Sequence, residues 1–465
     1  MAWGLRVTVV LYAILHFYTY FHPQSLVIQL LAVTGGGLFL FALVRTGARQ
    51  FKLPLILFTI GMIITDWSGH NITEGMENGF LLMRDIIGLL IIIPFISIVL
   101  REDDYLSAVL RAAPRLIDSS RKLYTGITLF TQVIAHFLLF GVIPMLYEFV
   151  NDFLKNERGE AWERFKGTAL LRGFALSTLW VISIPSFIFA VETMGASLWL
   201  AMLQGFFLAM VGTLIAVVFS KFEEKKSGVS LTEGIKEELS EILRQQETGD
   251  RKKAGEFVLL FVSLFGPIFL LHALFAAELM ITIPLVIIVW GLLYYTVKQK
   301  GNKLWEESKR YVVNETLGKG YQLSVMLSVG TLIYSLNQTN FAENAVVLLE
   351  VVEQQLPVVN FLSLLPFIVI LLGFTGLGPL TVMVLVAGIL TSIELPYPPE
   401  LIVLAVTSGS VISIVLSPLI MPTIVLSGSN GINSFKNGIV FNWKFSLVFY
   451  AAVQVYVQGV VYFVT

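Results

Sequence analysis

Apolar runs of membrane-spanning length recur along the whole chain, and they restrict its fold more than any other feature. About 20 consecutive apolar residues suffice to cross a bilayer. Hydrophobic residues make up 56% of this chain and charged residues only 14%, whereas soluble domains carry roughly 25% charged residues. Runs of this length suit helices, which satisfy their own backbone hydrogen bonds inside lipid. The sequence therefore predicts an all-α polytopic membrane protein.

The basic residues orient the expected spans. Spans are expected near 5–21, 25–44, 53–66, 79–100, 167–190, 198–219, 257–276, 279–297, 320–336, 401–430 and 445–463. Of the 31 Lys and Arg residues, all but Arg6, Arg84 and Arg172 lie in the loops 45–52, 101–123, 151–166, 220–256, 298–319 and 436–444. Because basic loops stay in the cytoplasm, this predicts a multi-pass protein of the inner or plasma membrane. Its N-terminus would be cytoplasmic and its C-terminus outside.

Two apolar stretches do not fit as full spans under this rule. Tyr124–Val150 has basic loops on both sides, and Phe361–Leu390 lies in a region from 337 to 400 without Lys or Arg. Each stretch is therefore expected to enter and leave the membrane on one side. The first would return to the inner side and the second to the outer side, as two re-entrant hairpins of opposite polarity.

The two halves of the chain share their breaker residues at a constant spacing. The matched pairs are Ser177 with Ser410, Pro185 with Pro418, Gly195 with Gly428, and Gly205 with Gly438. The first half would begin outside and the second inside, which predicts two inverted-topology repeats, a common plan of secondary carriers. The predicted parts are an N-terminal span (1–24), the repeats (25–219 and 257–465) and a cytoplasmic linker (220–256).

Four interruptions are expected at membrane depth, at the hairpin tips 140–144 and 374–379 and at breaks within the spans at 183–186 and 417–423. Half-helix N-termini offer N–H groups to an anion, and carbonyls freed by proline suit a cation such as Na⁺. The candidate substrate- or ion-binding residues are Gly141, Pro144, Ser183, Pro185, Ser186, Thr375, Gly376, Gly378, Ser417, Pro418, Thr423, Ser427, Ser429 and Asn430. The alternative is that these positions are packing kinks.

Ionisable residues inside the membrane are costly and are therefore functional candidates. His136 and Glu192 could carry a coupling proton or cation, although a packing histidine and a carboxylate at the outer surface are the alternatives. Arg172 lies near the inner end of its span, where it could snorkel to the interface. Arg84 and Asp85 are adjacent, and adjacent helix positions do not face each other, so separate partners are expected.

Several classes of function are disfavoured. The chain has no cysteine, hence no disulfide, thiolate metal site or cysteine nucleophile. Its five histidines lack metal-ligand spacing, and a net charge of −1 does not indicate nucleic-acid binding. His136 and Glu192 form no recognisable catalytic constellation. Neither an enzyme, a metal site nor a bound cofactor is expected, apart from Na⁺ as a possible coupling ion.

The predicted arrangement resembles the ion transporter superfamily, and most closely its divalent-anion:Na⁺ symporters. The resemblance implies scaffold parts (25–123 and 257–360), hairpin and transport parts (124–219 and 361–465), a homodimer and elevator-type alternating access. It implies a small anionic substrate coupled to Na⁺ or H⁺. Those carriers have Ser-Asn-Thr at the hairpin tips, whereas this chain has Phe140-Gly141-Val142 and Thr375-Gly376-Leu377, so the resemblance does not extend to dicarboxylate recognition.

Two alternatives remain at this point. The same scaffold could serve a Na⁺/H⁺ antiporter, although such a carrier needs a deep carboxylate, which the second repeat lacks away from its loops. The chain could also be a membrane protein that does not transport. The partners common to these hypotheses are the lipid bilayer and, for a carrier, a small-molecule or ion substrate.

Overall fold

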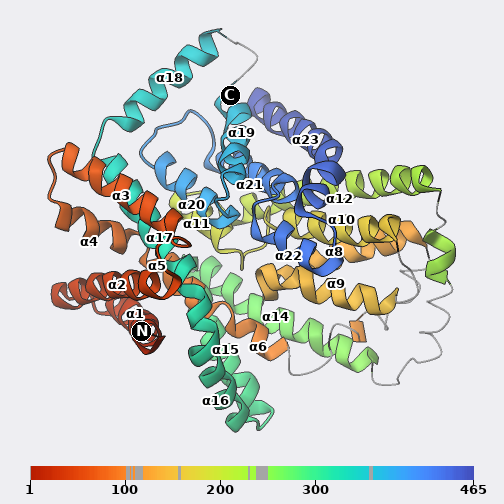
Figure 1. Ribbon diagram of the computed structural model, residues 1–465, viewed down its shortest axis with the longest axis horizontal. Helices are drawn as coiled ribbons and strands as arrows, with labels where there is room; N and C mark the ends of the chain where they lie inside the picture. The colour runs from red at the N-terminus through yellow and green to blue at the C-terminus, as the bar shows by residue number, and fades with distance from the viewer. Residues whose placement is uncertain are drawn as a thin grey trace. The chain divides into compact units, whose positions relative to one another are not determined.

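The computed structural model describes residues 2–100, 105, 108–109, 119–154, 159–228, 231–236, 250–355 and 360–464 (Figure 1). These residues form helices and connecting turns, with no strand among them. The all-α class is therefore confirmed. Of the expected linker 220–256, the stretches 229–230 and 237–249 lie outside the described residues.

The helices follow one another along the chain with short connections. In the first part they are α1 (Ala2–Phe21), α2 (Ser25–Thr46), α3 (Lys52–Trp67), α4 (Ile72–Leu82), α5 (Arg84–Ile92), α6 (Phe95–Leu100), α8 (Ser120–Leu138), η2 (Leu139–Gly141), α9 (Val142–Phe153), α10 (Glu160–Ser177), α11 (Pro185–Thr193) and α12 (Leu198–Ser227). In the second part they are α14 (Asp250–Phe275), α15 (Leu279–Val297), α16 (Gly301–Arg310), η3 (Tyr311–Glu315), α17 (Thr316–Asn337), α18 (Phe341–Gln355), α19 (Phe361–Phe374), α20 (Pro379–Leu390), α21 (Pro399–Leu416), α22 (Met421–Asn430), η4 (Lys436–Val440) and α23 (Phe441–Val464).

Many of these helices have the length and composition of membrane spans. Within the described residues, seven helices are long and apolar enough to cross a bilayer, or eight if the bent pair Ile72–Leu82 and Arg84–Leu100 forms one span. The chain is thus a polytopic membrane protein. The stretches expected as spans near 53–66, 167–190 and 320–336 form helices that are too short, interrupted or too polar to belong to this set.

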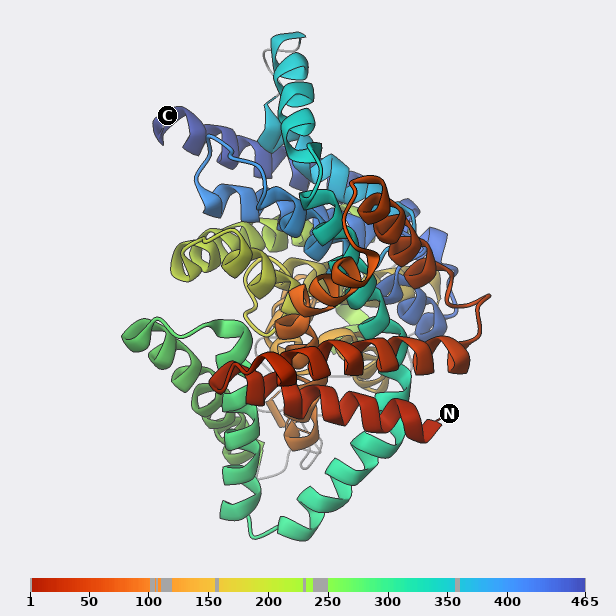
Figure 2. The same ribbon diagram turned by 90° about the vertical axis from the view of Figure 1, so that its left-hand side faces the viewer.

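The chain divides into two compact units, each assembled from separate segments. Unit 1 comprises Met1–Val99, Ser263–Gln355 and Val384–Leu395, and unit 2 comprises Leu100–Val262, Leu356–Met383 and Pro396–Thr465. In unit 1, α1 and α2 lie side by side (Figure 2), and α17 packs against α1, α2, α3 and α4.

Small residues let the helices of unit 1 approach closely, as is usual in membrane bundles. A Cβ at Gly61 of α3 would lie 3.1 Å from the backbone nitrogen of Leu332 on α17, and a Cβ at Gly79 of α4 would lie 2.9 Å from the backbone nitrogen of Thr331. Thr65 and Ser335 join α3 to α17 through a hydrogen bond of 2.7 Å between their hydroxyls. Packing of this kind fixes the register of these helices without large side chains.

The two stretches expected as hairpins each form a pair of helices. Tyr124–Val150 falls on α8 and α9, which contact each other across η2. Phe361–Leu390 forms α19 and α20, of 14 and 12 residues. At 1.5 Å per residue, neither α19 nor α20 is long enough to cross a hydrocarbon core of about 30 Å. The side on which each pair enters the membrane stays a prediction.

In unit 2, the first helix of each hairpin pair, α8 or α19, packs on an interrupted helix by the same kind of contact. Helix α8 packs on α10, and α19 packs on α21. A Cβ at Gly173 of α10 would lie 2.7 Å from the carbonyl oxygen of Thr128, and a Cβ at Gly409 of α21 would lie 2.8 Å from that of Pro366. In each half, therefore, a glycine on the interrupted helix allows the backbone of the first hairpin helix to pack closely against it.

Candidate functional site

Two helix interruptions form the centre of the candidate site in unit 2. Helix α10 ends at Ser177 and α11 begins at Pro185, with turns between them. Helix α21 ends at Leu416 and α22 begins at Met421. In an 18-residue apolar window of Pro399–Asn430, the stretch that contains the second interruption, 89% of the residues are buried. Helix α21 contacts both α10 and α11, so the two interrupted helices are neighbours.

Proline marks the restart of the chain after each interruption. Pro185 is the first residue of α11, Pro379 is the first of α20, and Pro422 is the second of α22, while Pro144 lies in the first turn of α9. Proline is tolerated in a first helical turn because the N–H that it lacks would have no intrahelical partner. The local sequence thus explains where these four helices begin.

The matched glycines Gly205 and Gly438 pack against the backbone of a break in the same way in the two halves. A Cβ at Gly205 of α12 would collide with the carbonyl oxygen of Leu179, in the first break. A Cβ at Gly438 of η4 would collide with the carbonyl oxygen of Leu416, at the second break. Each glycine therefore lets another helix pack directly on the backbone of a break.

Hydroxyl groups close part of the second interruption. The Ser417 hydroxyl donates to the carbonyl oxygen of Gly373 at 3.0 Å, which ties the end of α19 to the break. The Thr423 hydroxyl donates to the carbonyl oxygen of Ile414 at 3.2 Å, a carbonyl in the last turn of α21. Two of the predicted site residues thus stabilise the broken backbone themselves.

Three other hydroxyls at the interrupted helices are buried without a hydrogen-bond partner among the described residues. They belong to Ser183 in the first break and to Ser410 and Ser413 on α21. Ser183 was predicted as a site residue and Ser413 was not, and Ser410 was considered only as the repeat mate of Ser177. A signal was present, since Ser410, Ser413 and Ser417 follow a spacing of three and four residues on α21 and at its C-cap.

A buried polar chain joins the first hairpin helix to the first break. The indole nitrogen of Trp180 donates to the side-chain oxygen of Gln132 at 3.1 Å, and the Gln132 amide donates to the Thr213 hydroxyl on α12 at 3.1 Å. Gln132, at 1% exposure, was missed by the sequence analysis because a single glutamine in an apolar segment has no distinctive pattern.

The two candidate coupling residues lie in different settings. His136 is buried on α8, with Nδ1 3.2 Å from the carbonyl oxygens of Gln132 and Val133 and with its ring against Trp180. Glu192 lies partly exposed near the C-terminus of α11. His136 is therefore held by its own helix beside the first break, whereas Glu192 lies at the far end of α11 from that break.

The hairpin tips are more open than the breaks. At the first tip, Gly141 is exposed and Pro144 half-buried, and the chain turns at Leu139 with a φ of 46°. At the second tip, Gly376 has a φ of 89°, a conformation that favours glycine. The remaining predicted residues are Ser186, which is buried at 3% exposure, Thr375, which is exposed, and Gly378 and Pro418, which are half-buried.

Ser427, Ser429 and Asn430 lie at the end of α22 and form local contacts there. The Ser427 hydroxyl donates to the carbonyl oxygen of Ile432, and the Ser429 hydroxyl to that of Val425. Asn430 exchanges two side-chain hydrogen bonds with Asn437, at 2.9 and 3.0 Å. These three residues form the C-terminal end of α22 and are separated from the break by the length of that helix.

Arg172, which was expected to snorkel, has its guanidinium held inside the protein by hydrogen bonds. Its side chain is fully buried on α10. The guanidinium donates to the side-chain oxygen of Asn442, to the hydroxyl of Tyr124 and to the carbonyl oxygen of Phe441, at 2.8 to 3.0 Å. Glu223 lies 3.5 Å away as a counter-ion. These partners come from helices that are distant in sequence, so the sequence did not indicate them.

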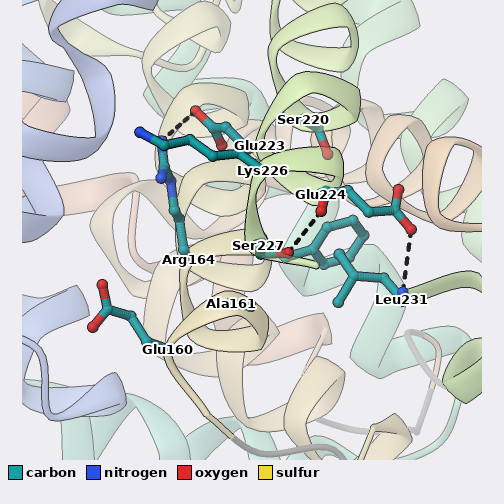
Figure 3. Close-up of a pocket in the computed structure, with 10 residues that line it drawn as sticks. Glu160, Ala161, Arg164, Ser220, Glu223, Glu224, Lys226, Ser227 and Leu231 are labelled. Atoms are coloured by element: carbon teal, nitrogen blue, oxygen red, sulfur yellow. Dashed lines mark hydrogen bonds and ion pairs between the residues drawn. The ribbon is translucent and has the colours of Figure 1, made fainter. Parts of the chain in front are cut away.

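A cavity of about 340 Å³ lies elsewhere in unit 2 and contains none of the predicted site residues (Figure 3). Its walls are the first turns of α10, the last turns of α12 and Leu231. Arg164 and Glu223 form an ion pair of 2.7 Å, and Glu224 accepts a hydrogen bond from the Leu231 backbone at 3.1 Å. Arg164, Glu223 and Glu224 are thus engaged in contacts between the helix ends that form the walls.

Comparison with known proteins adds no relationship. No protein-family model matches the chain, and no curated protein matches its sequence.

Proposed function

We propose that this protein is a secondary active transporter of a small anionic solute, coupled to Na⁺ or H⁺, with the substrate and ion bound between the two interrupted helices of unit 2. Every candidate binding residue belongs to unit 2 and none to unit 1. This distribution supports the proposal that unit 2 is the part that carries the solute. The proposal includes elevator-type movement in a homodimer.

The unpartnered hydroxyls of Ser183, Ser410 and Ser413 are the observation that carries the proposal. Leaving a buried donor or acceptor unpaired costs about 1–3 kcal/mol. A packing kink would give no reason to retain three such groups beside two breaks. Hydroxyl oxygens and freed carbonyls can coordinate a monovalent cation, while hydroxyl hydrogens and the N-termini of α11 and α22 can bind an anion.

Thermal unfolding of the purified protein with a panel of small anions, each in Na⁺ or K⁺ and across pH, tests the proposal. A ligand at about 100 times its dissociation constant adds about 2.7 kcal/mol to the native state, which is readily detected. We expect stabilisation that requires both an anion and Na⁺ or low pH. The same anion should then be taken up by proteoliposomes under an ion gradient.

A pair of serine variants makes the test specific to the site. Ser413→Ala should lower the apparent affinity for the anion at least tenfold, as measured from the anion-dependent stabilisation. Ser446→Ala is the matched control, because the Ser446 hydroxyl is also buried and unpartnered but lies on α23. Equal losses in both variants, or the absence of any anion effect on the wild type, would contradict the proposed site.

A further inference from the structure

A buried polar cluster in unit 1 takes no part in the proposed transport site. Tyr12 and His16 lie one turn apart on α1, with side chains 1% and 0% exposed. Asp85, at the start of α5, has its Oδ1 3.8 Å from His16 Nδ1. The Nε of Arg84 lies 3.5 Å from the same carboxylate oxygen. One oxygen of Asp85 therefore faces two alternative cationic partners.

The adjacent residues Arg84 and Asp85 were expected to need separate partners, and the structure shows that they form an ion pair. The two lie at the restart of the chain after a 44° bend between α4 and α5. A long arginine side chain can fold back beside a neighbouring carboxylate at such a helix end, where the geometry of a helix interior does not apply.

The hydrogen bonds of this cluster are incomplete. Within the described residues, the Tyr12 hydroxyl, both ring nitrogens of His16 and Oδ1 of Asp85 are buried without a hydrogen-bond partner. A neutral imidazole has one donor and one acceptor nitrogen, and a protonated one has two donors. The 3.8 Å between His16 and Asp85 exceeds a hydrogen bond but can close by a small side-chain rotation. A proton shared across this gap would satisfy a carboxylate oxygen and a ring nitrogen together.

Glycines shape the space around the two aromatic rings. Gly88 lies one turn after Asp85 on the same face of α5, and a Cβ there would come within 2.6 Å of His16 Nε2. Gly35 on α2 lies under the Tyr12 ring, with a Cβ position 3.3 Å from it. The absence of a side chain at Gly88 thus lets the imidazole pack directly against α5 beside Asp85.

The other charges around the cluster can be named helix by helix. Arg84 attracts the Asp85 carboxylate electrostatically, and Glu278, immediately before α15, repels it. Helix α15 itself has no charged residue. On α17, the Lys319 ammonium donates to the carbonyl oxygen of Leu90 at 2.7 Å. The charged residues on the remaining elements that pack against α1 or α5 are Arg6, Arg45, Glu74, Glu77 and Glu315.

We propose that His16 and Asp85 form a proton-binding site in unit 1, in which a proton from solvent is held on Nδ1 of His16 and donated to Oδ1 of Asp85. Without this proton, Asp85 pairs with Arg84. With it, the imidazolium and the guanidinium compete for one carboxylate oxygen. The Asp85 and Arg84 side chains are 30% and 31% exposed, so the protein does not enclose the carboxylate completely. The site does not depend on the proposed transport.

Nuclear magnetic resonance of the full chain, labelled with ¹⁵N in its imidazole rings, tests the proposal directly. The protein has only five histidines, and the His16→Gln variant assigns the relevant signal. We expect the ¹⁵N signals of His16 to show protonation of the ring as the pH is lowered over the range in which the protein stays folded. A His16 that stays neutral throughout this range, or one whose titration is unaffected by the variants below, would overturn the proposal.

Two variants, one that removes the anion beside His16 and one that removes the competing cation, make the test more specific. Asp85→Asn should lower the proton affinity of His16 at least tenfold. An opposite charge within about 4–6 Å favours the charged form of a group and shifts its pKa by about 1–3 units. Arg84→Gln removes the competing cation and should raise the proton affinity of His16. The buried His136 belongs to unit 2, and its signal serves as the internal control that should not move. If one variant does not fold, the shift expected for the other variant still tests the proposal.

Discussion

The two buried ionic clusters of this protein differ in how completely their polar groups are paired. Around Arg172 in unit 2, the guanidinium has three hydrogen bonds and a counter-ion, and the ring of Phe445 lies 4.8 Å beneath it. Around His16 in unit 1, four buried polar atoms have no hydrogen-bond partner among the described residues. Both clusters take polar groups out of solvent, but only in the first does each nitrogen of the central buried cation have a partner.

The difference separates a structural role from a functional one. A charge that is buried and fully hydrogen-bonded holds its partners in one arrangement, because removing any of them leaves the others unpaired. A cluster with open hydrogen-bonding capacity can accept a proton or ligand without first breaking a hydrogen bond. We therefore assign the Arg172 cluster to the stability of unit 2 and the His16 cluster to proton binding.

Replacing Arg172 should have the largest effect. Arg172→Met leaves Glu223, Asn442 and Tyr124 without their shared partner in a buried region, so we expect a loss of about 3–5 kcal/mol in unfolding free energy. Chemical or thermal unfolding in detergent measures this loss. A loss below about 1 kcal/mol would show that the network does not hold unit 2 together.

Replacing Gly88 should have the next largest effect. The added Cβ of Gly88→Ala would overlap the imidazole of His16, and overpacking of a buried position typically costs about 1–3 kcal/mol. Unfolding of the variant measures the cost. Gly141→Ala is the control, because a Cβ at Gly141 has no heavy atom within 4 Å. Similar stability of the two variants would mean that His16 does not pack against α5 as described.

A pair of tyrosine variants compares the two clusters with the same chemical change. Tyr124→Phe removes a hydroxyl that bonds Arg172 and Thr168, and we expect a loss of about 1–2 kcal/mol. Tyr12→Phe removes a hydroxyl without a hydrogen-bond partner, and we expect no loss or a gain of up to about 1 kcal/mol. Losses of equal size would remove the distinction between the clusters.

Much of the fold could be predicted from local patterns. Pro185 and Pro422 fall in the first turns of α11 and α22, where the breaks were expected, because proline limits a helix through its own covalent structure. The pairing of Gly205 with Gly438 identified two positions that pack on the breaks in the same way. The expected hairpins correspond to the helix pairs α8–α9 and α19–α20.

The candidate sites were less accessible to this reasoning. Ser183 was identified from its neighbouring proline, but the unpaired state of its hydroxyl depends on every helix around it. Ser427 and Asn430 were selected for their polarity, yet their partners Ile432 and Asn437 saturate them. Composition shows which groups can bind a ligand, whereas only packing shows which of them are already paired.

The sequence by itself determined the membrane class, the helical fold and the positions of the interruptions, because apolar length, proline and glycine act within a few residues of the backbone. The tertiary structure alone decided which buried polar groups have partners. Arg172 meets Asn442, and His16 meets Asp85, across long stretches of sequence that contain no trace of the contact. Hydrogen bonding acts over about 3 Å, so the pairing of such groups is fixed only when the helices that carry them have packed.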